Sequence, residues 1–541
     1  MGVCWCGLPS SPSRPLPPSS SREASRDGES PTRRAPASSH SSTKPTSFSA
    51  RLTNRSATSL APALGQEVVL MLTDLLANGQ GVGRAGGMVV FVSGGLPQER
   101  VRVRVSSVKA NYAVGDLLEI LVRSPDRAEP FCAVFGICGG CQVQHLAYPA
   151  QLRWKRNMVA SAFRRIAGVE AEVAETIGMP FPRHYRNKMS LVVQERPGGR
   201  FDVGFYQARS HEVVPIESCP IVLPQLDGYV RNLVSIARSP AAGSILRGVR
   251  HVVARAGRAL GHAVVSLTTE RPAEHLDRAV ARLVAALPDL VGVQNSFEPA
   301  SQNAVMGRKQ RTIWGQAEME EAIDGIRFRV SAASFFQVNS EMVGQIFRFI
   351  AAGLTKPRRV VDLYCGAGTF SIFFARLGCT VFGVEESSHA IEEACANALL
   401  NGVEATTEFA VGRVEDALHE PRIGLALRGA QIVFMDPPRK GVEPAALAAL
   451  AAARVPNIWY LSCNPATLAR DVGQLHAAGY EVGIVQPFDM FPQTGHVEVL
   501  CTLWRKDSAA KVDEEMRLTA SPPEASSAEP EEKEYPDFVI R

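Results

Sequence analysis

Apolar and polar positions follow two different patterns along the chain. From residue 331 onward, apolar runs of strand length alternate with helical stretches, and the runs cover 359–363, 380–385, 431–436 and 457–462. This alternation predicts a parallel, doubly wound sheet covered by helices on both faces. Ligands in such sheets bind at the carboxyl ends of the strands. The residues that close each run are therefore the first candidates for chemistry.

Shorter β-branched runs separated by Gly-rich turns fill residues 62–126. They predict a small antiparallel barrel. In the run 100–105, Arg and Val alternate, which places three arginines on one face and the valines on the other. Contact with RNA phosphates and simple solvation both explain such a face.

Residues 127–330 mix strands and helices and contain two basic clusters with embedded aromatics. Trp154 lies among Arg153, Lys155 and Arg156, with Arg164 and Arg165 nearby. Tyr185 lies among Arg183, His184, Arg186 and Lys188. Cations interleaved with flat rings suit phosphate contact and base stacking, although an ordinary exposed helix has a similar composition.

The two ends have compositions that do not support a packed core. Residues 1–61 are rich in Ser, Pro and Arg, and residues 506–541 are acidic, so we expect a disordered head and tail. The head is interpreted as a solvated extension or a start-site error, with a transit peptide as the alternative. The net charge of +4 averages over these ends and decides nothing.

Composition excludes several classes of protein. Apolar residues make up 45% of the chain, but no uninterrupted apolar run is long enough for a membrane span. The 11 cysteines are dispersed over 541 residues, which argues against a disulfide scaffold. We therefore predict a cytoplasmic protein in a reducing compartment.

Four of the strand ends carry candidate chemistry. The strand 359–363 continues into a glycine loop, and the next strand closes with Glu385, a carboxylate suited to ribose hydroxyls. This indicates a nucleoside cofactor, because the loop is neither a dinucleotide fingerprint nor a P-loop. Asp436 precedes two prolines that fix an extended turn. Cys463 ends another strand, where a nucleophile would be presented.

Six motifs together resemble the RNA 5-methyluridine methyltransferases, which use S-adenosylmethionine. They are SFFQVN, DLYCGAGTF, VFGVE, DPPRKG, LSCNP and FPQTGHVE, in this order. Residues 79–127 look like the amino-terminal TRAM barrel of these enzymes. The resemblance covers roughly 64–505. It implies an OB-like barrel, a central α+β domain at 127–330 and a Rossmann-like methyltransferase domain at 331–505.

The resemblance also implies roles for individual residues. Cys463 would be the nucleophile and Glu498 the general base. The S-adenosylmethionine site would consist of Gln337, Tyr364, Glu385 and Asp436. Phe335 matches a position where an aromatic ring stacks near the substrate. A thiolate is needed because uracil C5 is too weak a nucleophile until a group adds at C6, and a base must then remove the C5 proton.

A second constellation consists of cysteines in the central region. Three are clustered and one is distant, namely Cys132, Cys138, Cys141 and Cys219. Four thiolates suit a tetrahedral zinc or an iron–sulfur cluster, and unligated reduced cysteine is the remaining alternative. The three-plus-one spacing favours iron–sulfur. The resemblance agrees, because ribosomal-RNA members carry a [4Fe-4S] cluster on this arrangement.

The expected substrate is RNA, with 23S ribosomal RNA favoured because the transfer-RNA branch typically lacks the barrel and the cluster cysteines. The same reaction on the transfer-RNA T-loop uridine is the alternative. A catalytically silent RNA-binding or ribosome-assembly factor and a radical enzyme are alternatives of other classes. The target uridine should be flipped out of its stack. We expect a monomer without an obligate protein partner.

Overall fold

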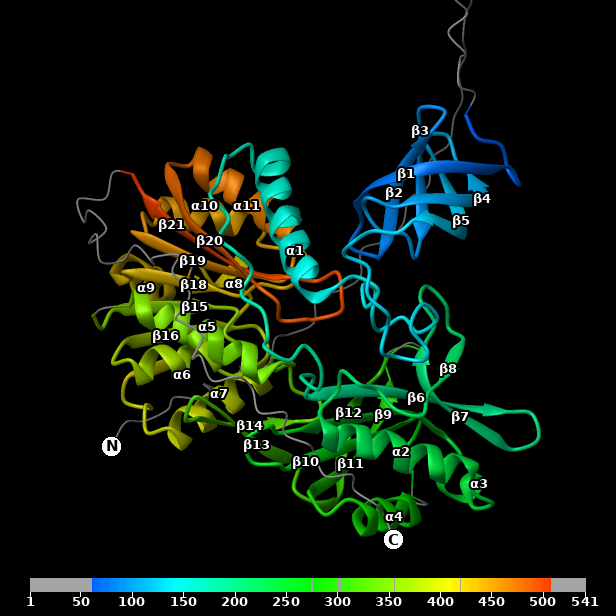
Figure 1. The fold of residues 1–541 in the computed structure, drawn as a ribbon. Coiled ribbons are helices and arrows are strands. Elements are labelled where there is room, and N and C mark those ends of the chain that lie inside the picture. The colour runs from blue at the N-terminus through cyan, green and yellow to red at the C-terminus, as the bar shows by residue number, and fades with distance from the viewer. Residues whose placement is uncertain are drawn as a thin grey trace, which may run out of the picture.

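The computed structural model describes residues 61–506, except 274–275, 300, 302–303, 355 and 419. The head and tail predicted to be disordered lie outside these residues, apart from their innermost positions 61 and 506. Three bodies are visible in Figure 1, a small barrel, a central sheet and a large helix-covered sheet. Among the described residues, no helix is both long and apolar enough to cross a membrane.

The amino-terminal body is a closed five-stranded barrel with the order β1-β2-β3-β5-β4. Its strands are β1 (Glu67–Leu75), β2 (Gln80–Ala85), β3 (Met88–Ser93), β4 (Arg100–Val108) and β5 (Tyr112–Val122). The prediction of a barrel is confirmed, but β3 and β5 pair in parallel. An odd number of strands cannot alternate in direction around a closed ring, so one parallel pair is required.

The alternation in β4 separates the two faces as predicted. Val101 and Val103 are fully buried in the barrel core, while the arginines between them are exposed. Two of these arginines form ion pairs on the surface, Arg102 with Glu119 at 3.3 Å and Arg104 with Glu67 at 2.9 Å. Part of the basic charge of this face is therefore already neutralised by neighbouring strands.

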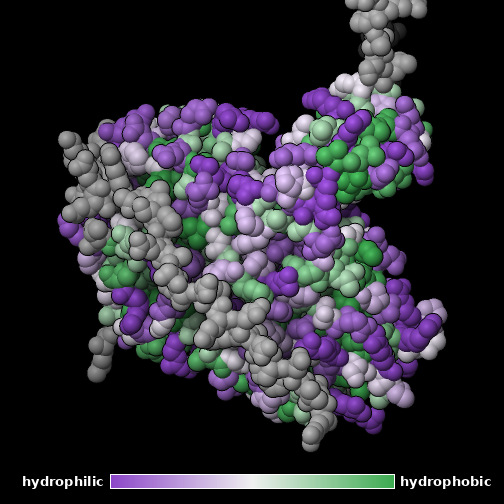
Figure 2. All heavy atoms as spheres, in the orientation of Figure 1, coloured by the Kyte–Doolittle hydropathy of each residue, from purple (hydrophilic) through white to green (hydrophobic). Residues whose placement is uncertain are grey.

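The outer surface of the barrel is not uniformly polar. Hydrophobic residues gather on the barrel face that is visible in Figure 2. Large apolar side chains on β1 and β5 are exposed, including Val69, Met71 and Val122. Contiguous apolar surface of this kind is a feature of interaction sites.

The central body is built on a seven-stranded sheet with the order β12-β11-β10-β9-β6-β7-β8. Its strands are β6 (Lys188–Arg196), β7 (Arg200–Tyr206), β8 (Val213–Pro215), β9 (Val249–Ala256), β10 (Ala263–Thr269), β11 (Leu290–Pro299) and β12 (Gly307–Gly315). The helices α2 (Pro224–Arg238), α3 (Ala242–Leu246) and α4 (Asp277–Ala286) pack against this sheet through a shared apolar core.

The carboxy-terminal body contains the predicted doubly wound sheet, with the order β17-β16-β15-β18-β19-β21-β20. Its strands are β15 (Arg359–Leu363), β16 (Thr380–Glu385), β17 (Thr407–Val411), β18 (Ile432–Met435), β19 (Asn457–Ser462), β20 (Tyr480–Phe488) and β21 (Glu498–Arg505). The five strands from β15 to β19 pair in parallel, and β21 joins antiparallel to both β19 and β20. The central strands are buried on both faces, as their apolar runs predict.

Helices cover both faces of this sheet. They are α5 (Ser340–Gly353), α6 (Thr369–Arg376), α7 (Ser388–Leu400), α8 (Val414–Ala417), α9 (Pro421–Gly429), α10 (Pro444–Ala452) and α11 (Pro465–Ala477). A hairpin of β13 (Glu318–Ile323) and β14 (Ile326–Ser331) shares the apolar core of α5 and α6. The hairpin thus connects the central body to the doubly wound sheet of the carboxy-terminal body.

Helix α1 (Tyr148–Ala162) and the following π-helical turn η1 (Phe163–Ala167) pack on the carboxy-terminal body, although they precede the strands of the central body in sequence. Val159 and Phe163 are fully buried in one core with Leu468 and Val472 of α11. In Figure 1, α1 lies beside α11 and faces the barrel. The helix is therefore placed between the barrel and the predicted catalytic residues.

Candidate active site

The antiparallel register of β19 and β21 brings the predicted nucleophile and the predicted base together. Ser462 is the Cα partner of Val499, so the next position on each chain beyond this pair is Cys463 and Glu498. Both residues lie at the carboxyl end of β19, where parallel sheets bind ligands. The two motifs are separated in the sequence, and β-sheet pairing makes them neighbours.

The Cys463 thiol is partly buried. Burial, together with the nearby charges of Glu498 and Asp436, raises its pKa to about 11. The charge of Arg439 and a hydrogen bond from it act in the opposite direction. The thiol is therefore mostly protonated near neutral pH, and Arg439 is the described group that favours the thiolate.

The Glu498 carboxyl is 2% exposed, and its Oε1 atom has no hydrogen-bond partner among the described residues. Burial raises its pKa well above the ordinary value, and the nearby Asp436 adds to the effect. Such an environment makes a carboxylate more basic. An unpaired buried oxygen beside a cysteine is suited to accept a proton from a bound ligand.

Two of the predicted cofactor residues are in direct contact. Gln337 donates a hydrogen bond from Nε2 to Asp436 Oδ2 at 3.1 Å. Loss of water around Asp436 raises the pKa of its carboxyl to about 7, and the hydrogen bond from Gln337 moderates this. Asp362 is fully buried on β15 and its pKa is also raised to about 7, first by burial and then by the charges of Asp436 and Glu385.

The glycine loop after β15 turns sharply beside these carboxyl groups. Tyr364, Gly366 and Gly368 have positive φ angles of 63°, 53° and 82°. Glu385 accepts hydrogen bonds from the Gly366 amide at 3.2 Å and the Ser387 amide at 3.0 Å. A non-glycine residue with positive φ is uncommon and recurs at functional sites. Tyr364 directs its hydroxyl to Glu415 at 3.3 Å.

This arrangement fits S-adenosylmethionine, as a test of its charge shows. The carboxyl groups of Asp362, Glu385 and Asp436 lie close together at this edge of the sheet, and burial raises the pKa values of Asp362 and Asp436 to about 7. S-adenosylmethionine carries a sulfonium and an ammonium group, which would supply a compensating positive charge. A Cβ atom added to Gly366 would meet no other atom within 4 Å, so the loop leaves room at this glycine for a close approach of the nucleoside.

Two further side chains border this region. Phe335, predicted to stack near the substrate, is 79% exposed. Arg439 contacts the His496 ring at 3.1 Å, and its carbonyl accepts a hydrogen bond from Asn464 Nδ2 at 3.0 Å. Sequence reasoning gave no role to Arg439. Its place directly after the two prolines of the motif was the available signal.

Of the two interpretations left open for the basic clusters, stacking of Trp154 and Tyr185 on RNA bases is not supported by their surroundings. Tyr185 is 1% exposed, and its hydroxyl donates to the Pro492 carbonyl at 3.0 Å. Trp154 donates from Nε1 to the Leu75 carbonyl at 3.0 Å and packs on a buried apolar cluster. Lys155 is also fully buried. These side chains hold the domains together, and sequence composition cannot separate that use from RNA contact.

The four predicted cluster cysteines lie in one neighbourhood of the central body. Burial, together with the charges of Cys219, Cys138 and Cys132, raises the pKa of Cys141 to about 12. The described residues nevertheless contain no group of three or more His, Cys, Asp or Glu side chains arranged to hold a metal ion. The iron–sulfur cluster therefore stays a prediction.

A doubly wound sheet with a glycine loop and carboxyl groups at its strand ends is typical of the S-adenosylmethionine-dependent methyltransferases, and a solved methyltransferase structure has a similar fold. Residues 147–506 match the tRNA (uracil-5-)-methyltransferase family, and residues 63–118 match the TRAM domain. The chain belongs to this family of RNA methyltransferases. The predicted family, fold class and enzyme class are confirmed.

Individual relatives agree with this assignment. An uncharacterized RNA methyltransferase of Halalkalibacterium halodurans is 38% identical over 463 residues, which are 83% of this chain and 99% of the relative. Another from Clostridium acetobutylicum is 36% identical over 79% of this chain and 95% of its own. The crystal structure of Pyrococcus abyssi tRNA (uracil-54, C5)-methyltransferase with S-adenosyl-L-homocysteine has a TM-score of 0.64 and 26% identity, and the match covers 80% of this chain and 100% of that one.

Proposed function

We propose that the protein methylates C5 of a specific uridine in RNA, with Cys463 as nucleophile and Glu498 as general base. The observation that carries the proposal is the β19–β21 register, which makes these two residues neighbours at the strand ends. Gln337, Tyr364, Glu385 and Asp436 would hold S-adenosylmethionine, which supplies the electrophilic methyl group when bound. Phe335 is exposed beside them and suited to stack on the target base.

The proposed reaction uses each group once. The Cys463 thiolate adds to C6 of the flipped uracil, and the electron pair of the C5–C6 double bond moves toward O4 as an enolate. C5 of the enolate would then form a bond to the methyl group of S-adenosylmethionine as the S–CH3 bond breaks, and S-adenosylhomocysteine would keep that bond's electron pair. Glu498 removes the C5 proton, the C6–Sγ bond breaks, and the thiolate leaves with 5-methyluridine formed. Arg439 favours the thiolate at the start and the end of this cycle.

The substrate we propose first is 23S ribosomal RNA, supported by the four cysteines, which the family resemblance associates with the ribosomal-RNA members. Transfer RNA is the second candidate, and a specific observation favours it. The Pyrococcus abyssi tRNA (uracil-54, C5)-methyltransferase matches over its whole length and over 80% of this chain. The barrel-containing architecture therefore does not by itself separate the two substrates.

The test is mass spectrometry of ribosomal and transfer RNA that carry 5-fluorouridine, incubated with the protein and S-adenosylmethionine. Fluorine at C5 cannot leave as a proton, so the cysteine should stay bonded to the methylated base. An adduct at Cys463 on one uridine supports the proposal and identifies the RNA. Absence of an adduct with both RNAs contradicts it and favours an RNA-binding factor without catalysis.

We also propose that Cys132, Cys138, Cys141 and Cys219 hold a [4Fe-4S] cluster. The mutual electrostatic effects of these thiols support the proposal, as does the preference of such clusters for four thiolates. Iron and acid-labile sulfide would be assayed after anaerobic purification. Cys141→Ser should lose both, whereas Cys379→Ser, a buried thiol elsewhere, should keep them. Equal iron content in the two variants would contradict the proposal.

A further inference from the structure

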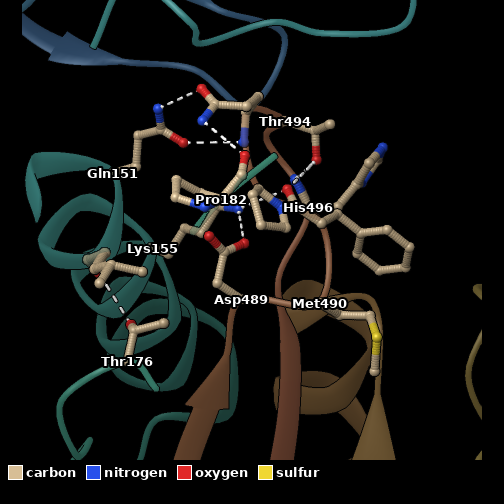
Figure 3. Close-up of polar contacts among 12 residues, drawn as sticks. Gln151, Lys155, Thr176, Pro182, Asp489, Met490, Thr494 and His496 are labelled. Atoms are coloured by element: carbon tan, nitrogen blue, oxygen red, sulfur yellow. Dashed lines mark hydrogen bonds and ion pairs between the residues drawn. The ribbon is translucent and has the colours of Figure 1, made fainter. Parts of the chain in front are cut away.

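The loop of residues 489–497, which joins β20 to β21 and leads directly into Glu498, is held by buried polar contacts (Figure 3). Asp489, Gln493 and Thr494 are all buried, at 0%, 4% and 6% exposure. Connecting loops usually lie on the surface, and binding or catalytic residues on them need a rigid scaffold. The contacts of this loop therefore determine the position of Glu498, the first residue of β21.

The first contact is an ion pair between α1 and the start of the loop. Lys155 Nζ lies 2.5 Å from Asp489 Oδ1 and also donates to the Phe491 carbonyl at 3.0 Å. Both charged side chains are 0% exposed. Because desolvation offsets much of the attraction in a buried ion pair, such pairs are weak sources of stability. The main effect of Lys155 is therefore to hold the loop in place at two residues, Asp489 and Phe491.

The second contact is a reciprocal pair of amides. The Gln493 backbone amide donates to Gln151 Oε1 at 3.0 Å, and Gln151 Nε2 donates to Gln493 Oε1 at 2.9 Å. The Gln493 carbonyl accepts from the amides of Gln142 and Val143. Gln493 has a φ of 69°, a conformation that persists only where surrounding contacts hold it. These contacts hold the backbone of the loop at Gln493 in a single conformation.

The two contacts come from one face of one helix. Gln151 and Lys155 are four residues apart on α1, a spacing that places their side chains together. The barrel packs against another side of the loop. A Cβ atom added to Gly495 would lie only 1.7 Å from the Ala77 carbonyl in the turn between β1 and β2. Helix α1 and the RNA-binding barrel therefore clamp the loop from two sides.

From these contacts we propose that Gln151 and Lys155 are positioning residues for the general base Glu498, an inference that rests on the proposed function. The Glu498 Oε1 atom has no partner among the described residues, so the backbone of the loop and strand must place it. Glu498 is needed only after methyl transfer, when it takes the C5 proton as the C6–Sγ bond breaks. Loosening the loop should slow elimination and leave addition unchanged.

The test is a single-turnover reaction on uridine-containing RNA, with the covalent methylated adduct and the free product quantified separately. The variant Gln151→Met removes the amide pair. Thr176→Val is the matched control, because it removes a part-buried hydrogen bond of 2.9 Å from the Thr176 hydroxyl to the Leu152 carbonyl of the same helix, and this hydroxyl is not bonded to the loop (Figure 3).

We expect Gln151→Met to accumulate adduct, with product release about tenfold slower or more and adduct formation changed less than about twofold. Thr176→Val should show no accumulation. The double variant Lys155→Met/Asp489→Leu removes the ion pair without leaving an unpaired buried charge, and it should reproduce the effect. It also decides the matter if Gln151→Met does not fold.

Parallel loss of adduct formation and product release, or identical behaviour of Gln151→Met and Thr176→Val, would overturn the positioning role. Failure of the proposed function is recognised separately. In that case the wild-type protein gives no adduct with 5-fluorouridine RNA, and the positioning role falls with it. A wild-type adduct without accumulation in either loop variant overturns the positioning role alone.

Discussion

Gln337 and Asp436, which come from motifs 99 positions apart, are joined by a hydrogen bond of 3.1 Å between Nε2 and Oδ2. Burial raises the pKa of the Asp436 carboxyl to about 7, and the hydrogen bond from Gln337 limits this rise. The side chain of Gln337 therefore helps to keep Asp436 ionised at neutral pH. An ionised Asp436 is the form that would attract a cationic ligand.

The first prediction concerns this pair. Gln337→Leu should raise the pKa of Asp436 further and weaken S-adenosylmethionine binding at pH 7 about fivefold, the equivalent of about 1 kcal/mol for one hydrogen bond. Raising the pH should restore part of the affinity, because it restores the carboxylate. Calorimetric titration at two pH values measures this. Gln486→Leu is the control, since Gln486 donates to the carbonyls of Glu175 and Pro487 instead.

The second prediction concerns the pH dependence of the nucleophile. Because the pKa of Cys463 is raised to about 11, the thiolate fraction should grow with pH across the neutral range. Adduct formation at saturating 5-fluorouridine RNA should therefore accelerate about tenfold per pH unit from about pH 6 to 9. A rate that is flat over this range would show that another step or another nucleophile controls adduct formation.

The third prediction concerns the cation beside that thiol. Arg439→Gln should raise the pKa of Cys463 further and slow adduct formation about tenfold at each pH, because it removes the charge and the hydrogen bond that favour the thiolate. Lys440→Gln removes the adjacent cation, which pairs with Glu443 at 3.2 Å, and should leave the rate unchanged. Equal rates in the two variants would refute the role of Arg439.

The catalytic half was predictable from the sequence because its signals are local. Buried strands appear as apolar runs, and the residues at their carboxyl ends must meet at one edge of a parallel sheet. Asp436 and Cys463 were found in this way. The rule does not cover β21, because this strand joins the sheet antiparallel. The proximity of Cys463 and Glu498 was therefore expected only from the family resemblance, and in the structure it follows from the register of β19 and β21.

The role of α1 was not predictable because it depends on tertiary packing. Lys155 and Trp154 stand among arginines in the sequence, yet both face inward, to the Asp489 carboxylate and the Leu75 carbonyl. Gln151 and Gln493 are 342 positions apart, and no periodic pattern in the sequence indicates that they are in contact. Composition gives the charge of a segment, whereas burial decides whether that charge meets a nucleic acid or another side chain.

The fourth prediction uses the arginine face of the barrel. Arg102 and Arg104 are paired with glutamates, whereas Arg100 has no ion pair with another described residue. Arg100→Ala should therefore weaken RNA binding more than Arg102→Ala and make the negative slope of log affinity against log salt shallower by about one. Fluorescence anisotropy at several salt concentrations measures this. If the barrel does not contact RNA, neither variant will change the slope.

The fifth prediction concerns stability, through the buried carboxyl of Asp362. Its pKa is raised to about 7 in the folded chain, so the protonated form is favoured there and the unfolded chain ionises first. Its contribution to the free energy of unfolding is therefore full below about pH 4 and is lost as the pH rises to about 7. Asp362→Asn cannot ionise and should escape this loss.

In the absence of S-adenosylmethionine, Asp362→Asn should match the wild type near about pH 4 and exceed it by about 2–4 kcal/mol near about pH 8. Denaturant unfolding at the two pH values measures the difference. Asp362 accepts a hydrogen bond from the Ser371 hydroxyl at 2.5 Å, which an asparagine oxygen can still accept. Asp471→Asn is the contrasting variant. Asp471 is also fully buried, but its Oδ2 atom accepts from both the Tyr460 hydroxyl at 2.7 Å and the Val442 amide at 2.9 Å, so its replacement should destabilise the protein at both pH values. A pH-independent effect of Asp362→Asn would show that packing, rather than ionisation, governs this position.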